Sequence, residues 1–179
     1  TAMQALEHLL SIHMAKIGLS EWNLVNNVSG AFGAFRRSFL DKIGGWDTHA
    51  DQTRRLTPVL GQLDDGMAAL RGQLGEAWRH TAVLVMTEFG RTARANGNNG
   101  TDHGTGGVAF LMGGAVSGGR VLADWPGLGD GQLFEKRDLA PTRDLRAIAK
   151  GLLRDHLRLS PEAIARAFPG SEAVAAENG

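Results

Sequence analysis

The sequence predicts an α/β fold in which a buried, mostly parallel sheet is flanked by helices. Two short apolar runs, Thr81 to Thr87 and Val108 to Met112, have the length and composition of strands that are buried on both faces. Segments with helical periodicity stand before and after them. Because 179 residues with 42% hydrophobic side chains suffice for one core, we expect a single domain over residues 1–179.

Before the first strand, the clearest element is a long amphipathic helix. Its apolar side chains recur at steps of three or four residues, at Leu56, Leu60, Leu63, Met67, Leu70, Leu74 and Trp78. Thr57-Pro58 predicts its first turn, because proline is favoured at the first helical position. Earlier still, Met3 to Ile17 has helical spacing and Phe39 to Ile43 is a candidate strand, but residues 1–43 otherwise give no clear assignment.

After the second strand, two helices are expected. The first covers Thr142 to His156, and Ser160-Pro161 begins the second, which Pro169-Gly170 ends. The Ala-rich tail at residues 171–179 is expected to fray.

Composition excludes several classes of function. Lys and Arg together number 19, as do Asp and Glu, and this balance argues against nucleic acid or an anionic membrane as the main partner. No apolar run approaches the roughly 18 residues of a membrane-spanning helix. Cysteine is absent, which removes disulfides, thiolate metal sites and cysteine nucleophiles.

The candidate chemistry lies in three polar clusters near the ends of the predicted strands. They contain Asp47 with His49, Glu88 with Arg91, and Asp102 with His103. Residues two apart in an extended segment point to the same side, so Asp47 and His49 can bind one ion together. Carboxylate and imidazole ligands suit a divalent metal, with zinc first and manganese or calcium as alternatives.

Each cluster also has a structural interpretation. Asp47 can turn the chain into the long helix, Glu88 and Arg91 can form a salt bridge, and Asp102 can bond to its own loop backbone. Other catalytic patterns are missing, since the sequence contains no Gly-x-Ser-x-Gly elbow, no phosphate-binding P-loop and no strand-borne Gly-x-Gly-x-x-Gly.

The three clusters with their neighbours resemble the family named DUF1501, a domain of unknown function. The resemblance covers residues 44 to 170 and continues through the blocks Gly113–Val121, Asp124–Leu128, Arg137–Thr142 and Phe168–Gly170. This family is similar to the alkaline-phosphatase and sulfatase superfamily, which implies a partial alkaline-phosphatase-like sandwich. The chain resembles the C-terminal part of that domain.

The resemblance implies metal ligands at Asp47, His49, Asp102 and His103, with Glu88 as a ligand or acid–base group and Arg91 holding an anion. The superfamily's Asp-His-Gly aligns either with Glu88-Phe89-Gly90 or with Asp102-His103-Gly104. Phe89 in the first alignment replaces an imidazole. The superfamily nucleophile and a further metal-binding Asp belong to the N-terminal half of the fold, and nothing in residues 1–45 resembles them.

Two functions are therefore expected. One is an exported, periplasmic bacterial hydrolase of small phosphate or sulfate esters, with a twin-arginine signal in the longer protein and little activity in the isolated chain. The alternative is a non-catalytic binding or scaffolding module of the bacterial envelope that keeps the fold.

Overall fold

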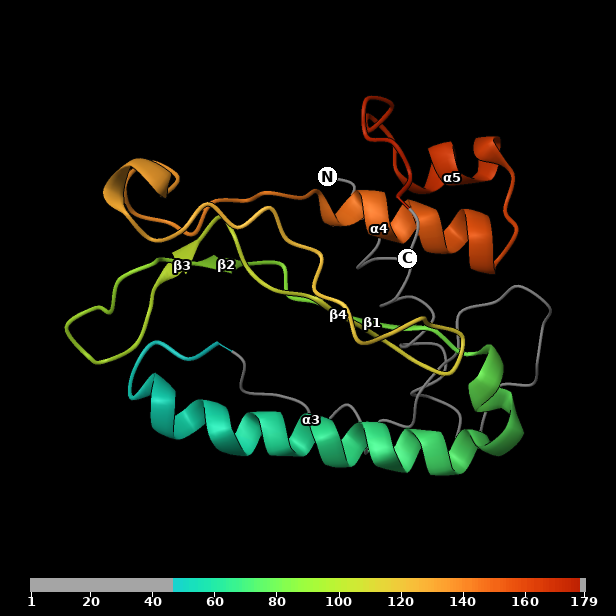
Figure 1. Cartoon of the computed structure of the whole chain (residues 1–179), viewed down its shortest axis with the longest axis horizontal. Helices are drawn as coiled ribbons and strands as arrows, with labels where there is room; N and C mark the ends of the chain where they lie inside the picture. Colours follow the sequence, from blue (N-terminus) through green and yellow to red (C-terminus); the bar gives the residue numbers. More distant parts are fainter. Residues whose placement is uncertain (1–46, 178–179) are drawn as a thin grey trace. The chain divides into compact units, whose positions relative to one another are not determined.

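The structure is a computed structural model of the 179-residue chain, and it describes residues 47–177. The predicted helix from Met3 to Ile17 and the predicted strand from Phe39 to Ile43 lie outside these residues. Residues 47–177 form three α-helices and two two-stranded sheets, so the α/β class is confirmed (Figure 1). They divide into two compact units, residues 47–143 and residues 144–177. Within residues 47–177, no helix has the length and apolar character needed to cross a membrane.

The first unit is built on the long helix α3 (Gln52–Leu74), which continues into the 3-10 helix η1 (Gly75–His80). The buried face of α3 consists of Val59, Leu63, Gly66 and Leu70, at alternating steps of four and three residues. This face differs slightly from the predicted stripe, since Leu60 is 41% exposed.

The predicted start of this helix at Thr57-Pro58 is wrong, because α3 begins at Gln52 and contains Pro58. Its first turn is fixed from outside the helix. The backbone N–H groups of Asp51 and Gln52 donate to the carbonyls of Asn98 and Asn99, both at 3.0 Å. A contact between segments almost 50 residues apart therefore outweighs the local signal of the proline.

The strands are shorter than predicted and pair in the opposite sense. Strand β1 (Val83–Val85) pairs antiparallel with β4 (Phe110–Met112), and β2 (Gly90–Arg91) pairs antiparallel with β3 (His103–Gly104). The expectation of a mostly parallel sheet is thus wrong for the strands of residues 47–177. Parallel neighbours need a long crossover, usually a helix, whereas the segment between β1 and β4 contains only loops and the β2–β3 pair.

The strands are also not buried on both faces. Val83–Val85 are half-buried and Phe110 is 38% exposed. An apolar run of strand length is typical of a central parallel strand, but it also fits a two-stranded pair that is partly covered by other segments. A 3-10 turn, η2 (Asp130–Gln132), follows β4 in the sequence, and Leu133 directly after it is buried.

The second unit contains α4 (Leu145–Gly151), the π-helical turn η3 (Leu152–His156) and α5 (Pro161–Ala167). Both predicted helices are confirmed. The Asp144 side chain caps α4 by accepting from the N–H of Arg146 at 2.9 Å, and the Ser160 side chain caps α5. Phe168 is the centre of this core, at 2% exposure.

Residues 171–177, which belong to the segment that was expected to fray, make hydrogen bonds to α4. The Nζ of the buried Lys150 donates to the carbonyls of Ser171 and Val174 at 2.6 and 2.9 Å. The backbone N–H of Glu177 donates to the carbonyl of Ala147 at 3.0 Å, above Gly151, where a Cβ atom would overlap the Glu177 carbonyl. Three hydrogen bonds therefore join this part of the tail to α4.

Candidate metal centre

Two candidate ligands lie on the short segment that enters α3. Asp47 and His49 are exposed, whereas Thr48 between them is buried at 3% exposure. This alternation confirms that the backbone turns the Asp47 and His49 side chains to the same side. The Nε2 atom of His49 lies 2.9 Å from Oδ1 of Asp47.

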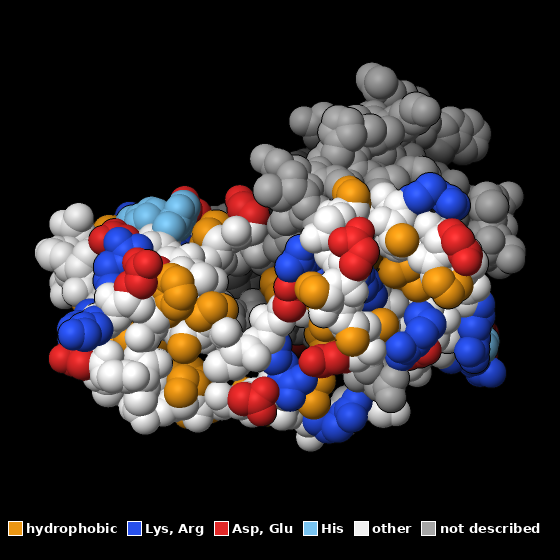
Figure 2. Space-filling model, turned by 90° about the horizontal axis from the view of Figure 1, so that it is seen from above, with side chains coloured by type: hydrophobic (Ala, Val, Ile, Leu, Met, Phe, Trp, Pro, Cys, Tyr) orange, Lys and Arg blue, Asp and Glu red, His pale blue; other side chains and the backbone are white. Residues whose placement is uncertain are grey.

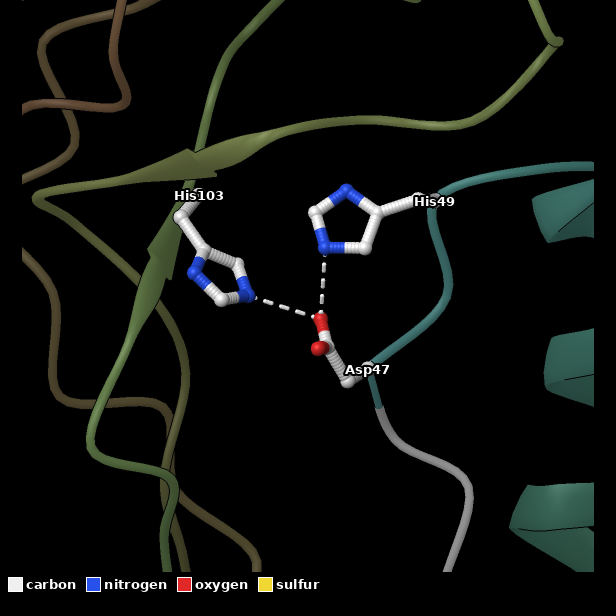
Figure 3. Close-up of side chains that lie close together, drawn as sticks. All are labelled: Asp47, His49 and His103. Atoms are coloured by element: carbon white, nitrogen blue, oxygen red, sulfur yellow. Dashed lines mark hydrogen bonds and ion pairs between the residues drawn. The ribbon is translucent and has the colours of Figure 1, made fainter.

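The third candidate comes from a distant part of the sequence. His103 lies on β3, and its Nε2 atom is 2.7 Å from the same Asp47 oxygen (Figure 3). The three side chains point toward one another, and their ligand atoms lie within 4.8 Å of one another. Figure 2 shows the histidine patch at the surface, beside acidic side chains. The centre is therefore open to solvent and to small solutes.

Arg91 lies beneath the exposed side chains of this centre and bonds one of them, Asp47. It is paired with His103 in the β2–β3 register, and its side chain is only 14% exposed. The guanidinium bonds Oδ1 of Asp47 at 3.2 Å and the carbonyl of Thr101 at 2.9 Å, and it lies over the ring of Phe89 at 4.7 Å. Three nitrogen groups, two imidazoles and one guanidinium, therefore converge on one carboxylate oxygen.

Hydrogen bonding favours the charged form of both nearby carboxylates. The hydrogen bond from His103, helped by the charges of His49 and Arg91, lowers the pKa of Asp47 below its ordinary value. The hydrogen bonds from Asn96 and then from His49 lower the pKa of Asp102. Both groups are thus anionic across the physiological range.

Asp102 has a different position from the other candidates. Its Oδ1 atom lies 3.4 Å from Nδ1 of His49 and accepts a hydrogen bond from Nδ2 of Asn96 at 2.9 Å. It is therefore on the Nδ1 side of the His49 ring, whereas Asp47 faces Nε2. The structure brings Asp47, His49, Arg91, Asp102 and His103 into one neighbourhood.

Glu88 is not part of this neighbourhood. It is exposed in the turn between β1 and β2, and no side chain in residues 47–177 bonds to it. The alternative salt bridge between Glu88 and Arg91 is not formed, because Arg91 bonds Asp47 instead.

The sequence reasoning missed the role of Asn96. Its Oδ1 atom accepts from the N–H groups of Asn98 and Gly100, and its Nδ2 atom donates to the His49 carbonyl and to Asp102. The Asn96-Gly97 pair signals a turn, but no sequence signal shows that the amide reaches a residue 47 positions earlier.

The glycines of the centre allow segments to approach closely. A Cβ atom on Gly100 would overlap the backbone of His49 and Ala50, and one on Gly104 would come within 2.9 Å of Cγ of Asp138. Asp138 is buried, bonds Nε of Arg137 at 2.6 Å and Thr105 at 3.0 Å, and supports β3 from behind. The ligand-bearing segments are therefore held by backbone packing as well as by side chains.

The fold and the site define an α/β chain with an exposed carboxylate–imidazole centre between two segments distant in sequence. Residues 37–168 match the family described as "Protein of unknown function (DUF1501)", and the chain belongs to that family. The comparisons with curated proteins and with solved structures give no match.

Proposed function

We propose that this chain carries the metal-binding part of a hydrolase that acts on phosphate or sulfate esters, with Asp47, His49 and His103 as ligands of one divalent ion. The observation that carries the proposal is the meeting of two Nε2 atoms at one carboxylate oxygen, at 2.7 and 2.9 Å. Ligand atoms of a tetrahedral zinc ion with bonds of about 2 Å lie about 3.3 Å apart, so small movements would seat an ion among them.

The two contacts of the His49 ring are compatible with a metal ion at this place. Both of its ring nitrogens face carboxylate oxygens, Nε2 toward Asp47 and Nδ1 toward Asp102. A neutral imidazole has only one N–H, so one of these contacts would set a lone pair against an anionic oxygen. A metal ion on Nε2 removes that repulsion, because Nδ1 then carries the N–H that faces Asp102.

The donor set favours zinc over calcium. Two imidazoles and one carboxylate are typical of open zinc sites, whereas calcium selects oxygen ligands. Manganese is the alternative with the same ligands. A bound ion of this kind polarises an ester oxygen and lowers the pKa of a bound water.

Other residues would then supply the remaining functions of a hydrolase. Arg91 holds Asp47 in place and brings a fixed positive charge to a surface that an anionic ester can reach. Glu88 bonds to none of these residues and lies outside their neighbourhood, so the proposal gives it no role at the ion. In this proposal the fold is the C-terminal part of an alkaline-phosphatase-like domain, with the nucleophile supplied by its N-terminal half, and the longer protein is exported to the periplasm.

One observation favours a non-catalytic binding module instead. The ring of Phe89 stacks on His103, with centroids 4.6 Å apart and an angle of 7° between planes. Phe89 thus covers one face of His103, a proposed metal ligand. In the alignment with Glu88-Phe89-Gly90, the superfamily resemblance implies an imidazole at the position of Phe89. A single-metal centre that binds an anion without turnover fits this arrangement.

A zinc titration of the purified chain tests the proposal. After removal of metals with a chelator, wild type should bind one zinc ion per chain in competition with a chromophoric chelator, and His103→Ala should lose this binding. His80→Ala is the matched control, because His80 is exposed at the end of η1 and bonds to no side chain in residues 47–177. Absence of zinc binding by wild type, or equal binding by His103→Ala, would contradict the proposal.

Turnover separates the two functions. Metal-dependent hydrolysis of an aryl phosphate or sulfate by the longer protein supports the hydrolase, and zinc binding without turnover there supports the binding module. Turnover by the 179-residue chain alone would overturn our placement of the nucleophile outside it.

A further inference from the structure

We infer that Asp102 is a positioning residue for His49 rather than a metal ligand, and that Asn96 fixes Asp102 in that role. This inference rests on the proposed metal centre, because it assigns the Nε2 atom of His49 to the ion. It gives different roles to Asp102 and His103, two neighbouring residues that the sequence analysis predicts to be ligands together.

Geometry places Asp102 on the wrong side of the His49 ring for coordination. Its Oδ1 atom faces Nδ1 at 3.4 Å, whereas Oδ1 of Asp47 faces Nε2 at 2.9 Å. A bond of about 2 Å from Nε2 to zinc points away from Nδ1. An ion seated between Asp47, His49 and His103 is therefore separated from Asp102 by the imidazole ring itself.

The same contact gives Asp102 a chemical task. A carboxylate that accepts a hydrogen bond from Nδ1–H fixes the tautomer in which Nε2 carries the lone pair. Asp47, which faces Nε2, favours the other tautomer when no metal is present. The contact with Asp102 thus favours the Nδ1–H tautomer of His49, which leaves the lone pair of Nε2 free to bind a metal ion.

Asn96 and Thr92 fix the position of Asp102. Nδ2 of Asn96 donates both to Oδ1 of Asp102 at 2.9 Å and to the carbonyl of His49 at 3.0 Å, so one amide joins the two partners. The backbone N–H of Asp102 donates to Oγ1 of the buried Thr92 at 3.2 Å, and the N–H of Thr92 donates to the Asp102 carbonyl at 3.0 Å. Asp102 is therefore anchored on its backbone and on its side chain before any ligand arrives.

Cobalt replacement distinguishes a ligand from a positioning residue. Co²⁺ takes the same ligands as zinc, and its visible absorption reports the set of bound atoms. We expect Asp102→Asn and Asp102→Ala to keep the wild-type cobalt spectrum and one metal per chain, with zinc affinity lowered by about 10–100-fold, as for other residues that orient a ligand. The loss should be larger for Ala than for Asn, because the Asn carbonyl still accepts a hydrogen bond. Asp65→Asn, on the exposed face of α3, is the control and should leave affinity unchanged.

Nitrogen NMR of the metal-free chain gives a readout that does not depend on metal binding. At alkaline pH, where imidazoles are neutral, the ¹⁵N shifts of His49 report its tautomer. Asp102→Asn and Asp102→Ala should move His49 toward the Nε2–H form, and Asn96→Ala should do so to a smaller extent. If wild type bound no metal but this shift occurred, the metal proposal would fail and the orienting contact would stand.

Two results would overturn the inference. A cobalt spectrum changed by Asp102→Asn as strongly as by His103→Ala would make Asp102 a ligand. An unchanged His49 tautomer together with zinc affinity within twofold of wild type would show that Asp102 has no influence on His49.

Discussion

A single oxygen atom organises the centre at the residue scale. Oδ1 of Asp47 accepts contacts from His49, His103 and Arg91, all between 2.7 and 3.2 Å. No one of these contacts would be notable on an exposed surface, where an isolated ion pair contributes little to stability. Their convergence on one atom is the observation on which the proposed metal centre rests.

Asp138 offers a test of the frame that carries these residues. Its hydrogen bond from Arg137, and then that from Thr105, lower its pKa in the folded chain. The unfolded chain therefore binds the proton more readily, and the free energy of unfolding contributed by Asp138 is present above the ordinary aspartate range and lost as pH falls through the folded-state pKa. Asp138→Asn removes this contribution.

We expect urea denaturation to show wild type more stable than Asp138→Asn by a constant margin at neutral pH, and the margin to shrink as the pH is lowered toward about 2. Asp65→Asn on the exposed face of α3 serves as control, with no margin that changes in this way. A margin independent of pH down to the same limit would show that the Asp138 carboxylate does not stabilise the fold through its charge.

At the scale of elements, the centre depends on the loop of residues 96–100 packing against the start of α3. Backbone hydrogen bonds join the two segments at Asp51 and Gln52. Just after the loop, the hydroxyl of Thr101 donates to Oε1 of Gln52 at 2.7 Å. Asp51 takes a left-handed conformation (φ 45°) where α3 begins, so the helix start itself is shaped by the loop. The loop thereby fixes the segment that bears Asp47 and His49.

Gly100→Ala tests this packing. The added Cβ would overlap the backbone of His49 and lie 2.6 Å from the Ala50 nitrogen, so the loop and the His49 segment must separate. We expect a loss of about 1–3 kcal/mol in the free energy of unfolding, measured by urea denaturation, together with weaker zinc binding. Gly97→Ala in the same loop is the matched control, because no atom lies within 4 Å of its added Cβ. Equal stability of the two variants would show that the loop does not need this close approach.

At the scale of the whole molecule, the sequence predicts the kinds of elements better than their arrangement. Ser160-Pro161 predicts α5 correctly because a hydroxyl cap and a proline act within one helical turn. Thr57-Pro58 predicts the wrong start for α3, because that start depends on distant residues. The N–H groups of Asp51 and Gln52 donate hydrogen bonds to the carbonyls of residues 98 and 99. The strand runs are recognisable, but their antiparallel pairing depends on the loops between them.

At the candidate site too, the sequence predicts the residue types but not the tertiary contacts between them. The types Asp, His and Arg in glycine-rich surroundings indicate the chemistry, and the spacing of Asp47 and His49 predicts that they face the same way. Which nitrogen of His49 faces which carboxylate cannot be read from spacing, because Asp102 and Asn96 reach it only through tertiary contacts. The role proposed for Asp102 therefore rests on these contacts and not on the sequence.

Anomalous scattering from crystals of the zinc-loaded chain, recorded on both sides of the zinc absorption edge, tests the central claim most directly. The account predicts one peak about 2 Å from an Asp47 carboxylate oxygen and from Nε2 of both His49 and His103, with Asp102 outside bonding distance. A peak elsewhere in residues 47–177, or none at this place when zinc is present in excess, would contradict it.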